Sequence, residues 1–240
     1  MPECQCQIGL RRIALVAAVA IAVSPLAAAR AQTPASALRA ARAATGAPAA
    51  TAAIARCGRV VWAGATGVWR SGSSDRVSTT TPFVLASVTK TVTATMILQL
   101  VQAGRLSLDQ RLIDFYPALP NASQITIREL LDHTSGLGEY LDSPKFDAIV
   151  QRDPAHRWTR DEVLSFVGTA AQFAPGARFE YTNTNYVVLG GILEALTGAG
   201  VEGDFQASVA APANMPRLTF AAVARASRSA YAGAPSCPPG

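Results

Sequence analysis

The chain has 240 residues, of which 50% are hydrophobic, 15% are charged and 7% are aromatic. This balance excludes a disordered or collagen-like chain and is typical of a globular, alanine-rich protein of one or two domains. The 21 basic and 16 acidic side chains leave a net charge of +5. Because that excess is small and scattered along the chain, we expect no nucleic-acid partner.

The N-terminal segment has the order of a signal peptide. Arg11 and Arg12 precede an uncharged stretch from Ile13 to Ala29, which is short for a bilayer span of about 20 residues. The stretch runs into Ala29-Arg30-Ala31, the small-x-small pattern that a signal peptidase cleaves. We therefore expect residues 1–31 to be a signal peptide, cleaved near Ala31, and the protein to be periplasmic or secreted. An uncleaved N-terminal anchor is the alternative.

Two of the four cysteines lie beyond this segment, Cys57 in a strand-like run and Cys237 in a Pro- and Gly-rich tail. We expect Cys57 to be a small buried hydrophobic residue, although an exported protein would also allow a disulfide between the two. The sequence contains no cluster with the spacing of metal ligands. It therefore predicts no metal and implies no cofactor.

The first predicted elements are a helix and a hairpin. Helix-forming residues fill 35–46, and Gly46 closes them. Two β-like runs follow at 51–56 and 59–69, and the Cys57-Gly58 step between them predicts a tight turn. The second run carries two glycines that we expect at bulges or close crossings, Gly64 and Gly67.

The rest of the chain predicts helices and loops. Apolar residues recur at helical spacing between Ser87 and Gln102. Two capping-box spacings and one Ser-Pro step predict further helix starts near Ile127, Pro144 and Arg160. A last helix covers 184–197 and ends at Gly198, with a Gly190-Gly191 pair that allows a neighbouring element to approach closely. Residues 226–240 lack periodicity and predict a disordered tail.

Lysine is rare in this chain, which makes Lys90 informative. The only lysines are Lys90 and Lys145, against 19 arginines. Lys90 lies three residues after Ser87 at the start of a predicted helix, so the amine can reach the hydroxyl. A partly desolvated lysine beside the positive end of a helix can lose its proton, whereas arginine cannot. Ser87 and Lys90 are therefore candidates for a nucleophile and its base. A helix-capping serine followed by a surface lysine is the alternative.

A second candidate pair lies immediately before the predicted helix at 184–197. Tyr181 and Asn183 are a phenol and an amide separated by one residue. A tyrosine near a protonated lysine can shuttle a proton, and a carboxamide can hold a substrate amide while orienting the lysine. A buried tyrosine followed by a capping asparagine is the alternative.

Three segments together resemble the serine β-lactamase and penicillin-binding protein superfamily. They are Phe83–Lys90 with the helix after it, His133-Thr134-Ser135-Gly136-Leu137, and residues 180–198. The run Tyr181–Tyr186 is similar to D-alanyl-D-alanine carboxypeptidases, class C β-lactamases and related esterases. The resemblance covers about 51–215. It implies a β-lactamase/transpeptidase-like α/β (α+β) fold, with an antiparallel sheet flanked by helices and a separate helical region.

The resemblance also implies roles for individual residues. Carried over position by position, it makes Ser87 the acylated nucleophile, Lys90 the adjacent base, Tyr181 the second proton-transfer group and Asn183 the ligand of the substrate amide. His133 falls in a loop that is structural in this superfamily, so we expect it to pack or cap.

Other aromatic and histidine side chains have no predicted chemistry. We expect His156 to be exposed to solvent without a partner. The three tryptophans are better explained by packing than by substrate binding; they are Trp62, Trp69 and Trp158.

The third motif of the superfamily, Lys-Thr-Gly or a variant on a strand that lines the cleft, has no match in this sequence. The C-terminal strands also have no counterpart, so we expect a domain over 32–225 that is incomplete. A two-stranded hairpin leaves sheet edges without partners. The resemblance further implies the loss of one of two N–H donors to the oxyanion, which costs on the order of 10²- to 10³-fold in turnover. We therefore expect weak activity.

The leading hypothesis is an exported serine hydrolase that forms an acyl-enzyme on a peptide, β-lactam or ester carbonyl. Its substrate would be a small molecule or a cell-wall peptide, and only the N-terminal segment would contact a membrane. Because the third motif is missing, we expect ester substrates to be slightly favoured over peptides and β-lactams. The alternatives are a catalytically impaired penicillin-binding-like fragment that binds without turnover and a pseudogene product without a stable fold. The sequence indicates no oligomeric state.

Overall fold

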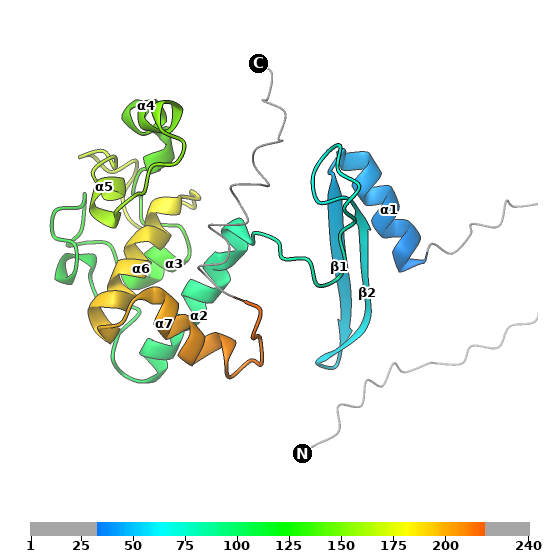
Figure 1. The fold of residues 1–240 in the computed structure, drawn as a ribbon. Coiled ribbons are helices and arrows are strands. Elements are labelled where there is room, and N and C mark those ends of the chain that lie inside the picture. Colours follow the sequence, from blue (N-terminus) through cyan, green and yellow to red (C-terminus); the bar gives the residue numbers. More distant parts are fainter. Residues whose placement is uncertain (1–32, 219–240) are drawn as a thin grey trace, which may run out of the picture. The chain divides into compact units, whose positions relative to one another are not determined.

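The computed structural model describes residues 33–218, so the expected signal peptide at 1–31 and tail at 226–240 lie outside the described residues. The chain divides into two compact units between Phe83 and Val84. One unit contains a helix and a strand pair, and the other contains helices and loops (Figure 1). The single domain expected over 32–225 stays a prediction.

The first unit begins with helix α1, Pro34–Thr45. The Thr33 side chain accepts a hydrogen bond from the backbone N–H of Ser36, and Pro34 occupies the first turn, where no partner for its nitrogen is needed. Gly46 ends the helix in the left-handed conformation, at φ 66°. The helix predicted at 35–46 is thus confirmed to within one residue.

Strands β1, Ala49–Arg56, and β2, Arg59–Gly67, form the predicted antiparallel hairpin. Cys57 and Gly58 connect them with φ values of 48° and 71°, the pair of positive angles that a tight two-residue hairpin turn requires. Cys57 is exposed, so the expectation that it is buried was wrong. The tip of a two-stranded hairpin projects away from any packed face and leaves the thiol in solvent.

The irregularity of the hairpin does not fall at a glycine. Ile54 pairs with Trp62 and Ala55 pairs with Val60, which leaves Val61 as the extra residue of a bulge. Gly67 is instead a close crossing, because a Cβ there would collide with the carbonyl oxygen of Pro48. The glycine pattern therefore predicted the crossing but not the bulge.

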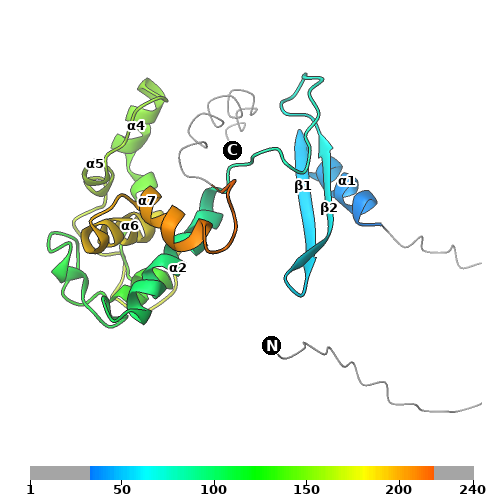
Figure 2. The same ribbon diagram turned by 60° about the horizontal axis from the view of Figure 1, so that its bottom comes forward.

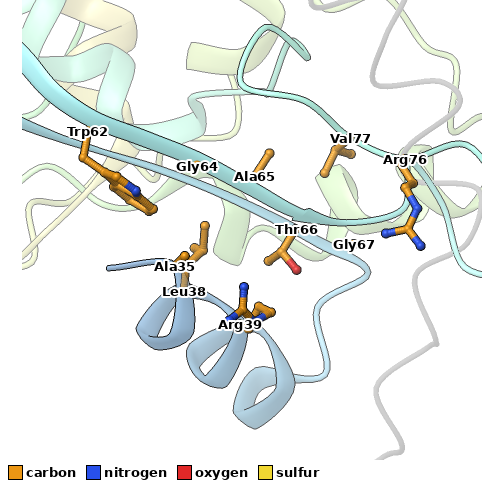
Figure 3. A pocket seen from close by; sticks show the side chains of 10 residues that line it. All are labelled: Ala35, Leu38, Arg39, Trp62, Gly64, Ala65, Thr66, Gly67, Arg76 and Val77. Atoms are coloured by element: carbon orange, nitrogen blue, oxygen red, sulfur yellow. The ribbon is translucent and has the colours of Figure 1, made fainter. Parts of the chain in front are cut away.

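Helix α1 lies along this hairpin, and the two border an open cavity of about 280 Å³. Figure 3 shows Leu38 and Arg39 of α1 on one side and the residues of β2 on the other, with Trp62 at one end and Arg76 at the other. None of the four candidate site residues lines this cavity.

The second unit is built from helices, visible in two views (Figures 1 and 2). Its α-helices are α2, Thr89–Gln102; α3, Ile127–Leu131; α4, Pro144–Arg152; α5, Arg160–Leu164; α6, Asn183–Thr197; and α7, Val201–Phe205. Short 3-10 turns at Ala86–Val88, Leu112–Asp114 and Tyr140–Asp142 and a π-helical turn at Gln206–Ala210 complete it.

The predicted helix starts in this unit are confirmed by their caps. Thr126 and Glu129 form a complete capping box at α3, and the Thr159 side chain accepts from the backbone N–H of Glu162 at α5. Pro144 opens α4, and Gly198 ends α6 at φ 72°. Local sequence thus sets these boundaries.

The core of the second unit lies where α2, α3 and α6 meet. Each helix contributes apolar side chains at helical spacing. The most deeply buried are Met96, Ile97 and Leu100 of α2, Ile127 and Leu130 of α3, and Val188, Leu189, Ile192 and Leu193 of α6. This packing holds the N-terminal ends of α2 and α6 close together, which brings the candidate residues into reach of one another.

An aromatic cluster covers the α4–α5 region. Trp158 stacks on Phe146 with ring centroids 4.6 Å apart and meets Phe166 edge-on, so its predicted packing role is confirmed. The prediction for His156 was wrong. Its imidazole is half-buried against Trp158 and its Nε2 lies 2.9 Å from the Glu162 carboxylate.

Within residues 33–218, no helix is long and apolar enough to cross a membrane.

Candidate active site

Ser87 lies in the 3-10 turn that leads into α2. The residue before it, Ala86, has φ 46°, a left-handed conformation that costs a non-glycine residue on the order of 1 kcal/mol. Ser87 itself is exposed, and no side chain caps α2 at its N-terminus. The alternative that Ser87 is a capping serine is therefore wrong, and its hydroxyl is accessible to a substrate.

The Lys90 amine contacts both Ser87 and the second predicted pair, Tyr181 and Asn183. Its Nζ lies 3.3 Å from the Ser87 Oγ and 2.6 Å from the Asn183 Oδ1. The amine also lies over the rings of Tyr181 and Tyr186, 4.8 and 5.6 Å from their centroids. The half-buried Lys90 is thus not the free surface lysine of the alternative interpretation.

Tyr181 also contacts Ser87. Its phenol donates a hydrogen bond of 2.9 Å to the Ser87 Oγ, although 94 residues separate the two in sequence. The ring is 45% exposed, so the alternative of a buried structural tyrosine is wrong. Hydrogen bonding from Lys90 is the largest cause that lowers the pKa of the Tyr181 phenol from its ordinary value, and the hydrogen bond with Ser87 is the second.

Asn183 is the first residue of α6, and the helix cap is its neighbour. The Thr182 side chain accepts from the backbone N–H of Thr184, so Asn183 is not the capping residue of the alternative interpretation. Its side-chain oxygen accepts from Lys90. The structure therefore brings all four predicted site residues together, and it places the Asn183 oxygen on the lysine.

His133 supports Tyr181 from behind. The two rings lie 4.5 Å apart, and the His133 Nδ1 accepts a hydrogen bond of 3.3 Å from the backbone N–H of Thr182. His133 is only 9% exposed. Burial, and secondarily the charge of Lys90, lowers the pKa of its imidazole. These contacts give His133 the packing role expected from the sequence.

Glu139 is a site residue that the sequence analysis missed. One oxygen of its carboxylate accepts from both the backbone N–H and the side-chain Nδ2 of Asn183, at 2.6 and 3.0 Å. It lies two residues after the His133–Leu137 segment, but 44 residues before its partner. No local spacing indicates this contact, so only the folded chain reveals it.

All four candidate site residues lie in the second unit. Within residues 33–218, strands occur only at 49–56 and 59–67, both in the first unit. In the same range, no three His, Cys, Asp or Glu side chains are close enough to share a metal ion. The chemistry available from these residues is a hydroxyl with two proton-transfer groups on it.

The sequence of this chain is similar to those of known proteins. The model of the beta-lactamase family matches residues 35–239. Penicillin-binding protein 4 of Amycolatopsis lactamdurans is 36% identical over 145 residues, which is 56% of this chain and 35% of that protein. Esterase EstB of Burkholderia gladioli is 34% identical over 179 residues, which is 70% of this chain and 45% of the esterase. The chain thus spans less than half the length of these relatives.

The same fold occurs among solved structures. A D-stereospecific amidohydrolase from Streptomyces sp. superimposes with a TM-score of 0.61 at 33% identity, covering 72% of this chain and 51% of that one. This likeness confirms the predicted β-lactamase/transpeptidase-like fold, with its mixture of helices and antiparallel strands. Because the family model matches most of the chain, the chain belongs to the beta-lactamase family.

Proposed function

We propose that this protein is a serine hydrolase that acts through an acyl-enzyme on Ser87. The observation that carries the proposal is that Lys90 and Tyr181, from two distant parts of the chain, both contact the Ser87 Oγ, at 3.3 and 2.9 Å. A serine hydroxyl is a weak nucleophile, and an adjacent base is what activates it. Family membership supports the same chemistry.

The acylation step uses the two contacts in sequence. Lys90 in its neutral form takes the Ser87 proton along the 3.3 Å contact while Oγ forms a bond to the carbonyl carbon of the substrate. The carbonyl π electrons move to the oxygen and then return as the bond to the leaving group breaks. Tyr181 gives its proton to the leaving group, and the Lys90 ammonium reprotonates Tyr181.

The lowered pKa of Tyr181 suits this role. A phenol that is more acidic than usual transfers its proton to a leaving group more readily, and its phenolate is stabilised by the nearby ammonium. Water then attacks the acyl carbonyl, its proton passes to the same pair of groups, and Ser87 regains its hydrogen as the acid product leaves.

We propose small esters and amides as the substrate class, with esters first. The relatives named above are a penicillin-binding protein, an esterase and a D-stereospecific amidohydrolase, and all three names fit acyl transfer at a carbonyl carbon. An ester needs less help at its leaving group than an amide does.

Hydrolysis of a chromogenic ester, such as p-nitrophenyl butyrate, tests the proposal. We expect Ser87→Ala to abolish hydrolysis and Lys90→Met to lower the rate about 10²- to 10⁴-fold. Lys145→Met is the matched control, because Lys145 is the other lysine and lies on α4 outside the site. Unchanged hydrolysis in either site variant would sink the assignment.

A burst of one product equivalent followed by no turnover would identify the alternative of a protein that binds covalently but does not hydrolyse. A penicillin and a D-amino-acid amide in the same assay distinguish the proposed ester preference from the other two carbonyl classes.

We also propose that the chain is exported, with residues 1–31 as a cleaved signal peptide. Support comes from Arg11 and Arg12 before the apolar stretch and from the Ala29-Arg30-Ala31 step. N-terminal sequencing of the protein from the periplasm of a Gram-negative host should give Gln32 as the first residue. Intact protein retained in the membrane fraction would support the uncleaved anchor instead.

A further inference from the structure

We infer that Glu139 is a positioning residue for acylation, because it fixes the Asn183 amide in the orientation that lets Asn183 hold the Lys90 amine beside Ser87. This inference rests on the proposed function of Ser87. It assigns a role to a side chain that no sequence motif identified, and it makes Asn183 a link between the Lys90 amine and the Glu139 carboxylate rather than only a substrate ligand.

The contacts of Glu139 are specific. Its Oε2 accepts from the backbone N–H of Asn183 at 2.6 Å and from the Asn183 Nδ2 at 3.0 Å. Its Oε1 accepts from the backbone N–H of Leu141 at 3.2 Å. Three donors thus hold a half-buried carboxylate in one place. Hydrogen bonds to a charged acceptor are about twice as strong as those between neutral groups.

The orientation of the Asn183 amide follows from the chemistry of its two neighbours. A lysine amine donates N–H to an acceptor in either protonation state, and a carboxylate can only accept. With Oδ1 on Lys90 at 2.6 Å and Nδ2 on Glu139 at 3.0 Å, both requirements are met. Turning the amide over would set Oδ1 against the carboxylate, which is repulsive, and would take the acceptor oxygen away from the Lys90 N–H groups. Glu139 thereby selects the orientation that Lys90 needs.

The backbone around Glu139 is anchored independently of its side chain. The carbonyl oxygen of Gly138 accepts from the Thr184 hydroxyl at 2.7 Å, and the backbone N–H of Tyr140 donates to the same hydroxyl oxygen at 3.2 Å. The residues on either side of Glu139 are therefore tied to the first turn of α6. A substitution of the carboxylate alone should leave this loop in place, so its effect reports on Asn183 and Lys90.

Exchanging the carboxylate of Glu139 and the amide of Asn183 tests the inference. The rate of Ser87 acylation by an activated ester is measured by mass spectrometry under single-turnover conditions for E139Q, N183D and the double variant. In E139Q the Asn183 side-chain amide is free to rotate by 180°. We therefore expect acylation to slow about 10- to 100-fold. In N183D two carboxylates face each other, and we expect a similar or larger loss.

The double variant restores one carboxylate and one amide in exchanged positions. The new carboxylate at position 183 would accept from Lys90, while the new amide at position 139 donates to that carboxylate, so we expect faster acylation than in either single variant. A residue that only supports the fold would not give this reciprocal rescue. Glu180→Gln is the matched control, because Glu180 adjoins Tyr181 in sequence but its carboxylate pairs with Arg178. An E139Q rate equal to wild type, or a double variant no faster than the faster of the two single variants, overturns the inference.

The side-chain NH₂ signal of Asn183 in ¹⁵N NMR spectra provides a second measurement that does not require acylation. N183D assigns the signal by removing it. We expect E139Q to shift it and Glu180→Gln to leave it in place. If the wild type is not acylated but the shift occurs, the proposed function fails and the contact that orients Asn183 stands. An unshifted signal in E139Q overturns the inference whatever the activity.

Discussion

The Lys90 amine lies 2.6 Å from the side-chain oxygen of Asn183, closer than its 3.3 Å distance to the Ser87 hydroxyl. This contact joins the first turn of α2 to the first turn of α6 across 93 residues of sequence. The lysine is therefore held by a residue of α6, and its reach toward Ser87 depends on how α6 presents Asn183.

Replacement of Lys90 by arginine separates two functions of the side chain, hydrogen-bond donation to Asn183 and proton transfer from Ser87. An arginine can still donate to Asn183, but it does not give up its proton. We expect Lys90→Arg to keep the fold and to slow ester acylation about 10²- to 10⁴-fold, measured as the rate of adduct formation. Lys145→Arg should react like the wild type. An active Lys90→Arg variant would show that Lys90 is not the base.

Tyr181→Phe removes one hydrogen bond and keeps the ring. The phenyl group can still pack on His133 and lie near Lys90, so we expect the free energy of unfolding to change by less than about 0.5 kcal/mol. Acylation should slow by about 10²-fold or more because the group that protonates the leaving group is gone. Urea unfolding and acylation are measured on the same preparation. Wild-type kinetics in Tyr181→Phe would remove the phenol from the mechanism.

Two adjacent glycines in α6 should respond in opposite directions to alanine. A Cβ on Gly191 would collide with the Tyr116 hydroxyl and would lie 2.9 Å from the Arg160 Cδ, whereas a Cβ on Gly190 would meet nothing within 4 Å. We expect Gly191→Ala to destabilise by about 1–3 kcal/mol and Gly190→Ala to stabilise by up to about 1 kcal/mol, because alanine is the better helix former. Thermal unfolding followed at 222 nm tests both. Equal effects would contradict the packing at Gly191.

His133 should make stability depend on pH. Its pKa is lowered in the folded state by burial and by Lys90, so the unfolded chain binds a proton at higher pH than the folded one does. Stability is then full above the unfolded pKa of about 6.5 and falls as the pH drops from there toward the lower folded value. Urea unfolding at pH 7.5 and pH 5.5 measures the loss.

The variant His133→Gln is the control for this effect. Glutamine does not titrate but can still accept from the backbone N–H of Thr182. The loss of stability between the two pH values should therefore be smaller in His133→Gln than in the wild type. An identical loss in both proteins would assign the pH dependence to other groups.

Much of the fold follows from local signals in the sequence. The caps at Thr126 and Thr159, Pro144 at the start of α4 and the glycine ends of α1 and α6 act within a few residues, so their patterns predict helix boundaries well. Ser87 lies in the 3-10 turn that leads into α2 and Lys90 lies three residues later, so their spacing predicts that the amine is within reach of the hydroxyl.

The errors arose where position in the fold overrides local pattern. Cys57 is apolar enough to be buried, but the turn it occupies projects it into solvent. His156 gains its partner Glu162 only because the chain between them folds back. Glu139 meets Asn183 across 44 residues, and a lone glutamate in a loop gives no sign of which amide it will bind. Long-range polar contacts of this kind need the folded structure.

Acylation of Ser87 is tested most directly by the intact mass of the purified protein after incubation with an activated ester and, separately, with a penicillin. We predict one added acyl group on the wild type with the ester, and none on Ser87→Ala. A well-folded wild type that gains no acyl group from either reagent, or an equal adduct on Ser87→Ala, would contradict the claim that Lys90 and Tyr181 make Ser87 a nucleophile.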